Sequence, residues 1–144
     1  MSRTLDANVL LYASDAASPQ HAVARRVLED AAAGPGIVYL FWPTVMAYLR
    51  LATHPAVFSR PLALGEAIRN VEALLARPHV RTAGEGEAFW QRFRAVADDA
   101  RPTGNLVPDA HVAALMLEHD VRTIVTRDRD FRRFGRIETE DPFG

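Results

Sequence analysis

The chain has 144 residues, of which 49% are hydrophobic and 24% charged, and it contains no cysteine. This length and composition predict one globular domain over residues 1–144, and they exclude disulfide frameworks, thiolate metal sites and cysteine nucleophiles. The net charge of −1 does not indicate a nucleic-acid binder. No signal peptide or run of roughly 18 apolar residues is present, so we expect a soluble, cytoplasmic protein without a membrane span.

Short strands and helices are expected to alternate along the first half of the chain. Ser18-Pro19 is a typical helix start, and Gly34-Pro35-Gly36 is a typical helix end. The apolar, β-prone run before Trp42-Pro43 predicts a buried strand. In chain order, the predicted elements are a strand, two helices, a strand and a helix: Thr4–Leu5, Val9–Ala13, Ser18–Ala33, Ile37–Phe41 and Trp42–Ala52.

The second half continues the same alternation. Pro78 closes an amphipathic helix, and the segment after Pro108 is apolar on nearly every side, which predicts a buried helix. The predicted elements are a helix, a weak strand, two helices and a strand: Leu64–Arg77, His79–Thr82, Glu87–Ala100, Asp109–His119 and Thr123–Thr126. This order predicts an α/β domain with a mainly parallel sheet, in which ligands bind at the carboxyl ends of the strands.

Aspartates occupy those strand ends. Asp6 follows the first predicted strand, Asp128 and Asp130 follow the last, and Asp109 lies at the second position of the buried helix. Each of them alone is better explained by a structural role: a helix cap for Asp6, a helix-dipole contact for Asp109, and solvated turn acids paired with neighbouring arginines for Asp128 and Asp130. Together they predict a carboxylate cluster, which a cation must neutralise. Oxygen ligands without histidine or cysteine favour Mg²⁺ or Mn²⁺ over zinc.

Such a cluster suits phosphodiester hydrolysis. Two divalent ions about 4 Å apart can activate a water molecule and stabilise the leaving oxygen. No arrangement typical of serine or cysteine nucleophiles is found in the sequence. All 17 basic residues are arginines, so phosphate contacts from side chains must be made by guanidinium groups. A basic cluster beside the last strand offers such groups: Arg127, Arg129, Arg132, Arg133 and Arg136.

The motifs around these acids resemble those of a known family. Leu5–Leu10, Asn105–Leu115 and Thr126–Phe131 resemble the first, third and fourth motifs of PIN-domain ribonucleases. Leu49–Pro55 and Phe58–Leu62 resemble one branch of the VapC-type toxins. The resemblance covers nearly the whole chain, and it is the order and spacing of the motifs that carry it.

The resemblance implies a PIN-like three-layer α/β/α domain with a mainly parallel sheet of four or five strands. It implies a Mg²⁺- or Mn²⁺-dependent endoribonuclease, the toxin of a type II toxin–antitoxin system, which cuts single-stranded loops of tRNA or rRNA. It also implies a homodimer and a cognate VapB-type antitoxin. By motif match, Asp6, Asp109 and Asp128 would be catalytic metal ligands, with Asp130 as an auxiliary catalytic residue and Asn8 and Asn105 as supporting residues.

One position departs from the family pattern. Ala47 stands where the family usually has a glutamate in the helix after the second strand. We hypothesise that Arg50, three residues further on the same helix face, binds the scissile phosphate, with Arg127 as a second phosphate contact. The alternative for Arg50 is a salt bridge to Asp6 or Asp128. The alternative for the whole chain is a catalytically impaired PIN-fold module that acts by RNA or partner binding.

The remaining aromatic residues suggest packing. Phe131 and Phe134 are expected in the core, and so is Trp42, although an exposed ring at Trp42 would be able to stack a base. The stripe of Phe89, Trp90 and Phe93 predicts either packing or a dimer face.

Overall fold

The computed structural model describes residues 2–58 and 60–144 of the chain. Ser59, within one of the family-like segments, lies outside the described residues. The strands are β1 (Ser2–Leu5), β2 (Ile37–Phe41), β3 (Val80–Ala83), β4 (Thr123–Val125) and β5 (Glu138–Glu140). The helices are α1 (Ala7–Ser14), α2 (His21–Ala33), α3 (Trp42–Ala52), α4 (Leu64–Leu75), α5 (Phe89–Ala100) and α6 (Leu106–Glu118), with a short 3₁₀ helix, η1 (Arg129–Arg133).

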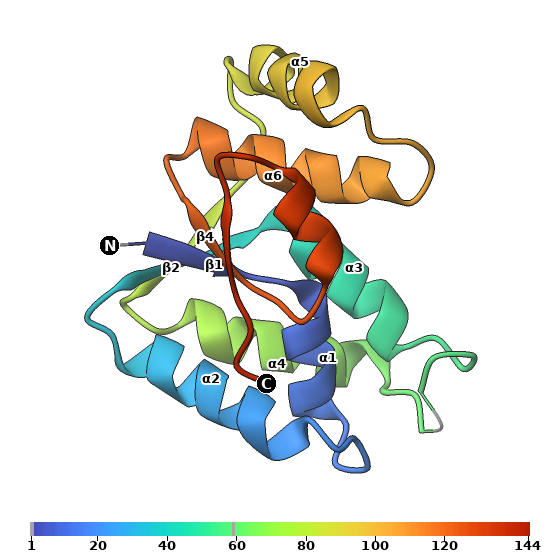
Figure 1. Ribbon diagram of the computed structural model, residues 1–144. Coiled ribbons are helices and arrows are strands. Elements are labelled where there is room, and N and C mark those ends of the chain that lie inside the picture. The colour runs from blue at the N-terminus through green and yellow to red at the C-terminus, as the bar shows by residue number, and fades with distance from the viewer. Residues whose placement is uncertain (1, 59) are drawn as a thin grey trace.

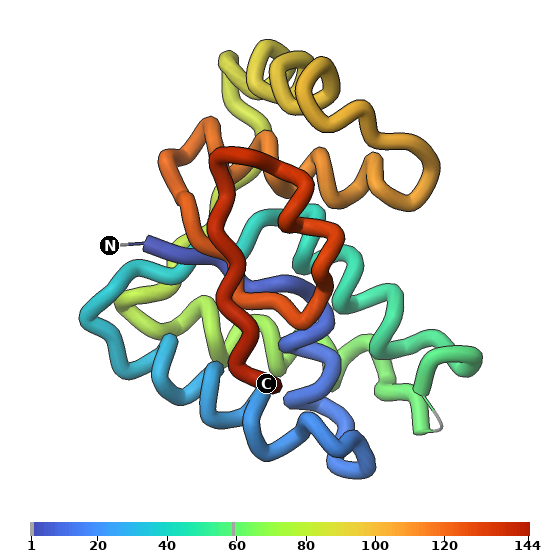
Figure 2. The backbone as a smooth tube through the Cα atoms, viewed as in Figure 1, coloured from blue at the N-terminus to red at the C-terminus, as the bar shows by residue number. Residues whose placement is uncertain are grey.

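The five strands form one parallel sheet in the order β3-β2-β1-β4-β5. Figure 1 shows α5 and α6 on one side of this sheet and α1, α2 and α4 on the other. The tube in Figure 2 follows the C-terminal segment across the sheet to its end beside α1, where the rings of Phe143 and Tyr12 meet edge to face at 5.4 Å. The predicted α/β/α fold with a parallel sheet is confirmed.

Alternation along β2 builds a core on each face of the sheet. Val38 and Leu40 pack with α1, α2, α3 and α4, whereas Tyr39 and Phe41 pack with α5 and α6. Successive side chains of a strand point to opposite faces, and the strand is apolar on both because helices cover both. The second core also holds Phe131 and Phe134, as predicted.

The α6 helix begins at Leu106, three residues before its predicted start. Asp109 is therefore its fourth residue, and Pro108 lies within the first turn. A proline is tolerated there because the first N–H groups of a helix have no partner within the helix. In contrast, α2 begins later than predicted, at His21, because Ser18 forms a turn in which its hydroxyl accepts from the Gln20 N–H at 3.2 Å.

One expectation from the sequence is wrong, and two elements were missed. Trp42 is not in the core, since 44% of its surface is exposed. The strand β5 and the helix η1 were not predicted at all. In the described part of the chain, no helix is long and apolar enough to cross a membrane.

Candidate functional site

Three carboxylates meet where β4 ends and α6 begins. One side-chain oxygen from each of Asp109, Asp128 and Asp130 lies within 4.8 Å of the others. Asp109 and Asp128 are half-buried and Asp130 is exposed, so the group opens to solvent. The short η1 helix creates this arrangement, because Asp128 caps it and accepts a hydrogen bond from the Asp130 N–H at 2.8 Å.

Asp6 adjoins this group from the end of β1. It occupies the N-cap position of α1 without a capping hydrogen bond from its side chain, and its backbone N–H donates to the Val125 carbonyl at 3.0 Å, which ties the ends of β1 and β4 together. Burial raises the pKa of its carboxyl group, and the charge of Asp128 raises it further, while a hydrogen bond from Thr126 lowers it. Asp6 is thus electrostatically coupled to the cluster, although it is not one of its three closest members.

Among the four aspartates, the pKa is shifted most at the carboxyl group of Asp109. Burial, and then the charges of Asp128, Asp6 and Asp130, raise its pKa from 3.8 to about 7. All four causes act in the same direction, and none of them is a cation. Within residues 2–58 and 60–144, no salt bridge joins any of the four aspartates to an arginine. The protein therefore concentrates negative charge here without balancing it.

Thr126 connects the two halves of the site, and sequence reasoning missed it. Its buried hydroxyl donates to the Asp6 Oδ2 at 2.7 Å and accepts from the Asp128 N–H at 2.9 Å. One hydroxyl thus fixes a carboxylate on β1 and the backbone turn that carries Asp128. The available signal is its position, since Thr126 is a polar residue at the end of an apolar strand and two residues before an aspartate, where the sequence predicts only the last residue of the strand.

The predicted supporting and phosphate-binding residues are not part of the closest carboxylate group. Asn105 caps α6 and is exposed, Asn8 is half-buried on α1, and neither side chain makes a hydrogen bond to the described residues. Ala47 lies on α3 and brings no carboxylate. Arg50 and Arg127 are both exposed. In the described part of the chain Arg50 makes no salt bridge to Asp6 or Asp128, so that alternative for Arg50 is wrong.

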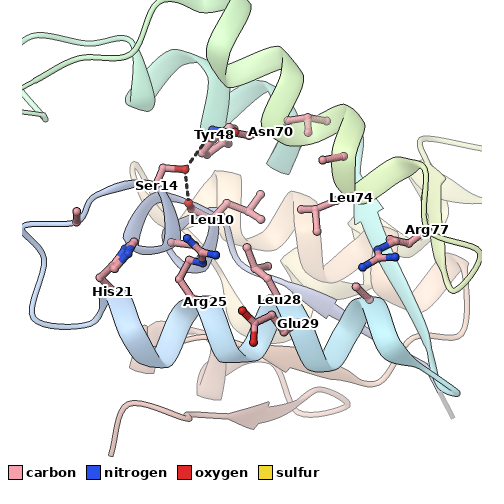
Figure 3. Close-up of a pocket in the computed structure, with 15 residues that line it drawn as sticks. Leu10, Ser14, His21, Arg25, Leu28, Glu29, Tyr48, Asn70, Leu74 and Arg77 are labelled. Atoms are coloured by element: carbon pink, nitrogen blue, oxygen red, sulfur yellow. Dashed lines mark hydrogen bonds between the residues drawn. The ribbon is translucent and has the colours of Figure 1, made fainter.

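A cavity in the described structure lies elsewhere. It has a volume of about 610 Å³ and lies between α2 and α4, with α1 at its base (Figure 3). The Asn70 side chain donates to the Tyr48 hydroxyl at 3.0 Å, and that hydroxyl is 2.7 Å from the Ser14 hydroxyl. None of the four aspartates lines this cavity. Chemistry rather than cavity size therefore identifies the candidate site.

The donor set fits a hard divalent cation. Carboxylate oxygens are the ligands that Mg²⁺ and Mn²⁺ prefer, whereas zinc favours nitrogen and sulfur. The four aspartates offer only oxygen, and in the described part of the chain no salt bridge balances their charge, so an ion would supply the missing positive charge. Partial exposure leaves space for water ligands, which Mg²⁺ tends to keep.

Known proteins resemble the chain over its whole length. The family model described as PIN domain matches residues 4–137. Ribonuclease VapC48 of Mycobacterium tuberculosis is 50% identical over 143 residues, which cover 99% of each chain. The structure of VapC20 from M. tuberculosis, a sarcin–ricin loop cleaving toxin, has a TM-score of 0.68 at 16% identity and covers 96% of this chain and 99% of its own. A toxin–antitoxin complex from Klebsiella pneumoniae has a TM-score of 0.63 at 18% identity and covers 98% of both chains.

Proposed function

Because the chain belongs to the PIN-domain family, and within it to the VapC ribonucleases, we propose that it is a Mg²⁺- or Mn²⁺-dependent endoribonuclease. The observation that carries the metal dependence is the group of Asp109, Asp128 and Asp130, whose carboxylate oxygens lie within 4.8 Å of one another. Asp6 adds a fourth carboxylate to the same edge of the sheet. Like charges at these distances repel, so the ionised group requires a cation.

The position of each residue determines its proposed role in metal binding, positioning or phosphate binding. Asp6, Asp109 and Asp128 come from three elements and would hold the ion, and Asp130 extends the group towards solvent. A bound divalent cation supplies positive charge to the scissile phosphate and lowers the pKa of the attacking water. Thr126 holds the Asp6 carboxylate and the Asp128 backbone in fixed relation. The remaining phosphate contacts fall to Arg50 and Arg127, which are exposed and free of salt bridges to the described residues.

We propose single-stranded loops of tRNA or rRNA as the substrate class. The name of VapC48 supports RNA, and the sarcin–ricin loop named for VapC20 supports a loop in a structured RNA. The proposed setting is the cytoplasm, where these RNAs are found. The proposed partners are a VapB-type antitoxin, supported by the fold shared with a toxin–antitoxin complex, and a second copy of the chain.

Cleavage by the purified protein tests this proposal. We expect RNA with unpaired loops to be cut in Mg²⁺ or Mn²⁺, the cutting to stop in EDTA, and activity to return when the ion is restored in excess. Cleavage that persists in EDTA would contradict the metal dependence. Binding to RNA without cleavage under any divalent ion would favour a catalytically impaired module, the alternative that Ala47 suggests.

A further inference from the structure

Trp42 is an exposed aromatic side chain at the first position of α3. It follows directly after β2 and has 44% of its surface exposed. The residues that form the two hydrophobic cores do not include it. Burial of a tryptophan stabilises a fold by a large apolar area, and the exposed part of Trp42 is free to contact another molecule.

The register of the sheet places Trp42 beside the candidate site. Thr4 on β1 pairs with Tyr39 on β2, so Asp6 is level with Phe41, and Trp42 is the next residue. Neighbouring strands are about 4.8 Å apart, so the backbones of Asp6 and Trp42 are adjacent at the carboxyl edge of the sheet. The backbone of Trp42 is therefore next to Asp6, while its indole lies on the β3 side of β2, at the end of the strand that precedes Gly84.

A glycine on the neighbouring strand end leaves room for the ring. Gly84 follows β3, and a Cβ atom on it would lie 3.1 Å from the Trp42 Cδ1. Contacts as short as this are tighter than most real Cβ contacts, so a larger residue at position 84 would push the indole away. One side of the indole thus lies next to Gly84, while 44% of the surface of Trp42 is exposed to solvent.

The helix face that carries Trp42 holds two more exposed side chains. Met46 and Arg50 follow Trp42 at intervals of four residues, which places the three side chains in a row on α3. Met46 is 54% exposed and Arg50 is exposed. An aromatic ring, an apolar side chain and a guanidinium group in one row suit a single nucleic-acid strand. Bases stack on aromatic faces, and arginines bind phosphates.

We propose that Trp42 stacks on an unpaired base of the RNA next to the scissile phosphate, an inference that rests on the proposed ribonuclease function. A base within a duplex is stacked between its neighbours and has no free face, so a stacking Trp42 selects single-stranded RNA. A second copy of the chain is the other partner that the exposed side chains of Trp42 and Met46 could bind. The position beside the acidic group and the arginine in the same row favour the nucleotide.

Tryptophan fluorescence tests the stacking, because the chain has only two tryptophans and the other, Trp90, is 62% exposed on α5. The variant Trp90→Phe reports on Trp42 alone, and Trp42→Phe reports on Trp90 alone. Both are made with Asp109→Asn to stop cleavage and are titrated with a single-stranded RNA oligonucleotide. We expect quenching only in the first variant, and little quenching from an abasic strand of the same length.

Binding and kinetics provide the second measurement. Trp42→Ala is expected to weaken binding of single-stranded RNA about 10- to 100-fold, with Trp42→Phe retaining most of the affinity and Trp90→Ala close to wild type. In the active enzyme the loss should appear mainly in KM, with the pH profile of cleavage unchanged.

Three outcomes distinguish base stacking from a contact between copies, and from failure of the proposed nuclease function. If RNA binds but the Trp42 fluorescence does not change, stacking is wrong. If Trp42→Ala converts a dimer into a monomer while RNA affinity per subunit is unchanged, the row is a contact between copies and stacking is also wrong. If RNA quenches Trp42 but the wild-type protein does not cut it in any divalent ion, stacking is supported and only the proposed nuclease function fails.

Discussion

Replacing Asp109 with asparagine is expected to abolish RNA cleavage and, at the same time, to stabilise the metal-free protein above neutral pH. Loss of a ligand that would hold the charge-balancing cation costs several kcal/mol of transition-state stabilisation, or about 1000-fold in rate. The opposite effect on stability follows from the pKa of the Asp109 carboxyl group, which is raised from 3.8 to about 7. Asparagine keeps the shape of the side chain but has no charge to ionise.

The sign of the stability effect follows from where the proton is bound. The folded state holds the Asp109 proton more tightly than the unfolded state, so this stability is present below about pH 4 and is lost as the pH rises to about 7. Because Asp109 is only half-buried, we expect the loss at pH 8 to be about 1–2 kcal/mol after solvent screening.

Urea denaturation at pH 5 and pH 8 in EDTA measures the stability difference. Asp30→Asn, the same change at an exposed aspartate on α2, is the matched control and should alter neither activity nor the pH dependence. Full activity in Asp109→Asn would rule out this carboxylate as a ligand. Equal stabilities of wild type and variant at pH 8 would contradict the charge repulsion.

The change Thr126→Val is expected to reduce cleavage about 10- to 100-fold, although Thr126 itself touches neither ion nor substrate in this account. Valine has nearly the same shape as threonine but cannot donate to Asp6 or accept from the Asp128 N–H. Loss of a buried hydrogen bond to a carboxylate also destabilises the fold by about 1–3 kcal/mol. Without that donor the pKa of the Asp6 carboxyl group rises further above its ordinary value.

The pH profile separates this positioning role from simple loss of stability. A higher Asp6 pKa means that more of the carboxyl group is protonated at neutral pH, so the variant should need more Mg²⁺ and should recover activity as the pH rises. Thr126→Ser keeps the hydroxyl and is expected to behave like wild type in both respects. A Thr126→Val enzyme with unchanged Mg²⁺ requirement and pH profile would show that the hydrogen bond to Asp6 does not matter.

The sequence predicted the location of the acidic group because parallel strands all end at one edge. Asp6 and Asp128 each follow a strand, and no detail of packing is needed to infer that they share that edge. The composition of the closest group was not predictable in the same way. Asp130 lies within the tight group whereas Asp6 stands beside it, since the turn of η1 decides where the Asp128 and Asp130 side chains point.

The elements that sequence reasoning missed are those with weak apolar patterns. β5 consists of Glu138, Thr139 and Glu140 at the edge of the sheet, where it pairs with β4 but buries little. Such a strand is held by backbone hydrogen bonds rather than by alternating apolar residues, so no periodicity marks it.

The exposure of Trp42 was hidden for a related reason. A tryptophan next to a buried strand is usually part of the core, and the prediction followed that tendency. In the structure its ring lies against Gly84, which is distant in sequence but follows the neighbouring strand. Only the pairing of β2 with β3 brings the two residues together.

The central claim is that aspartates from β1, β4 and α6 share a divalent cation, and crystals soaked in Mn²⁺ test it most directly. Anomalous scattering should show Mn²⁺ among the carboxylates of Asp109, Asp128 and Asp6, with oxygen ligands at about 2.1 Å, and no ion at that place in Asp109→Asn. An empty acidic group at a Mn²⁺ concentration that supports RNA cleavage, or an ion bound only elsewhere, would contradict the claim.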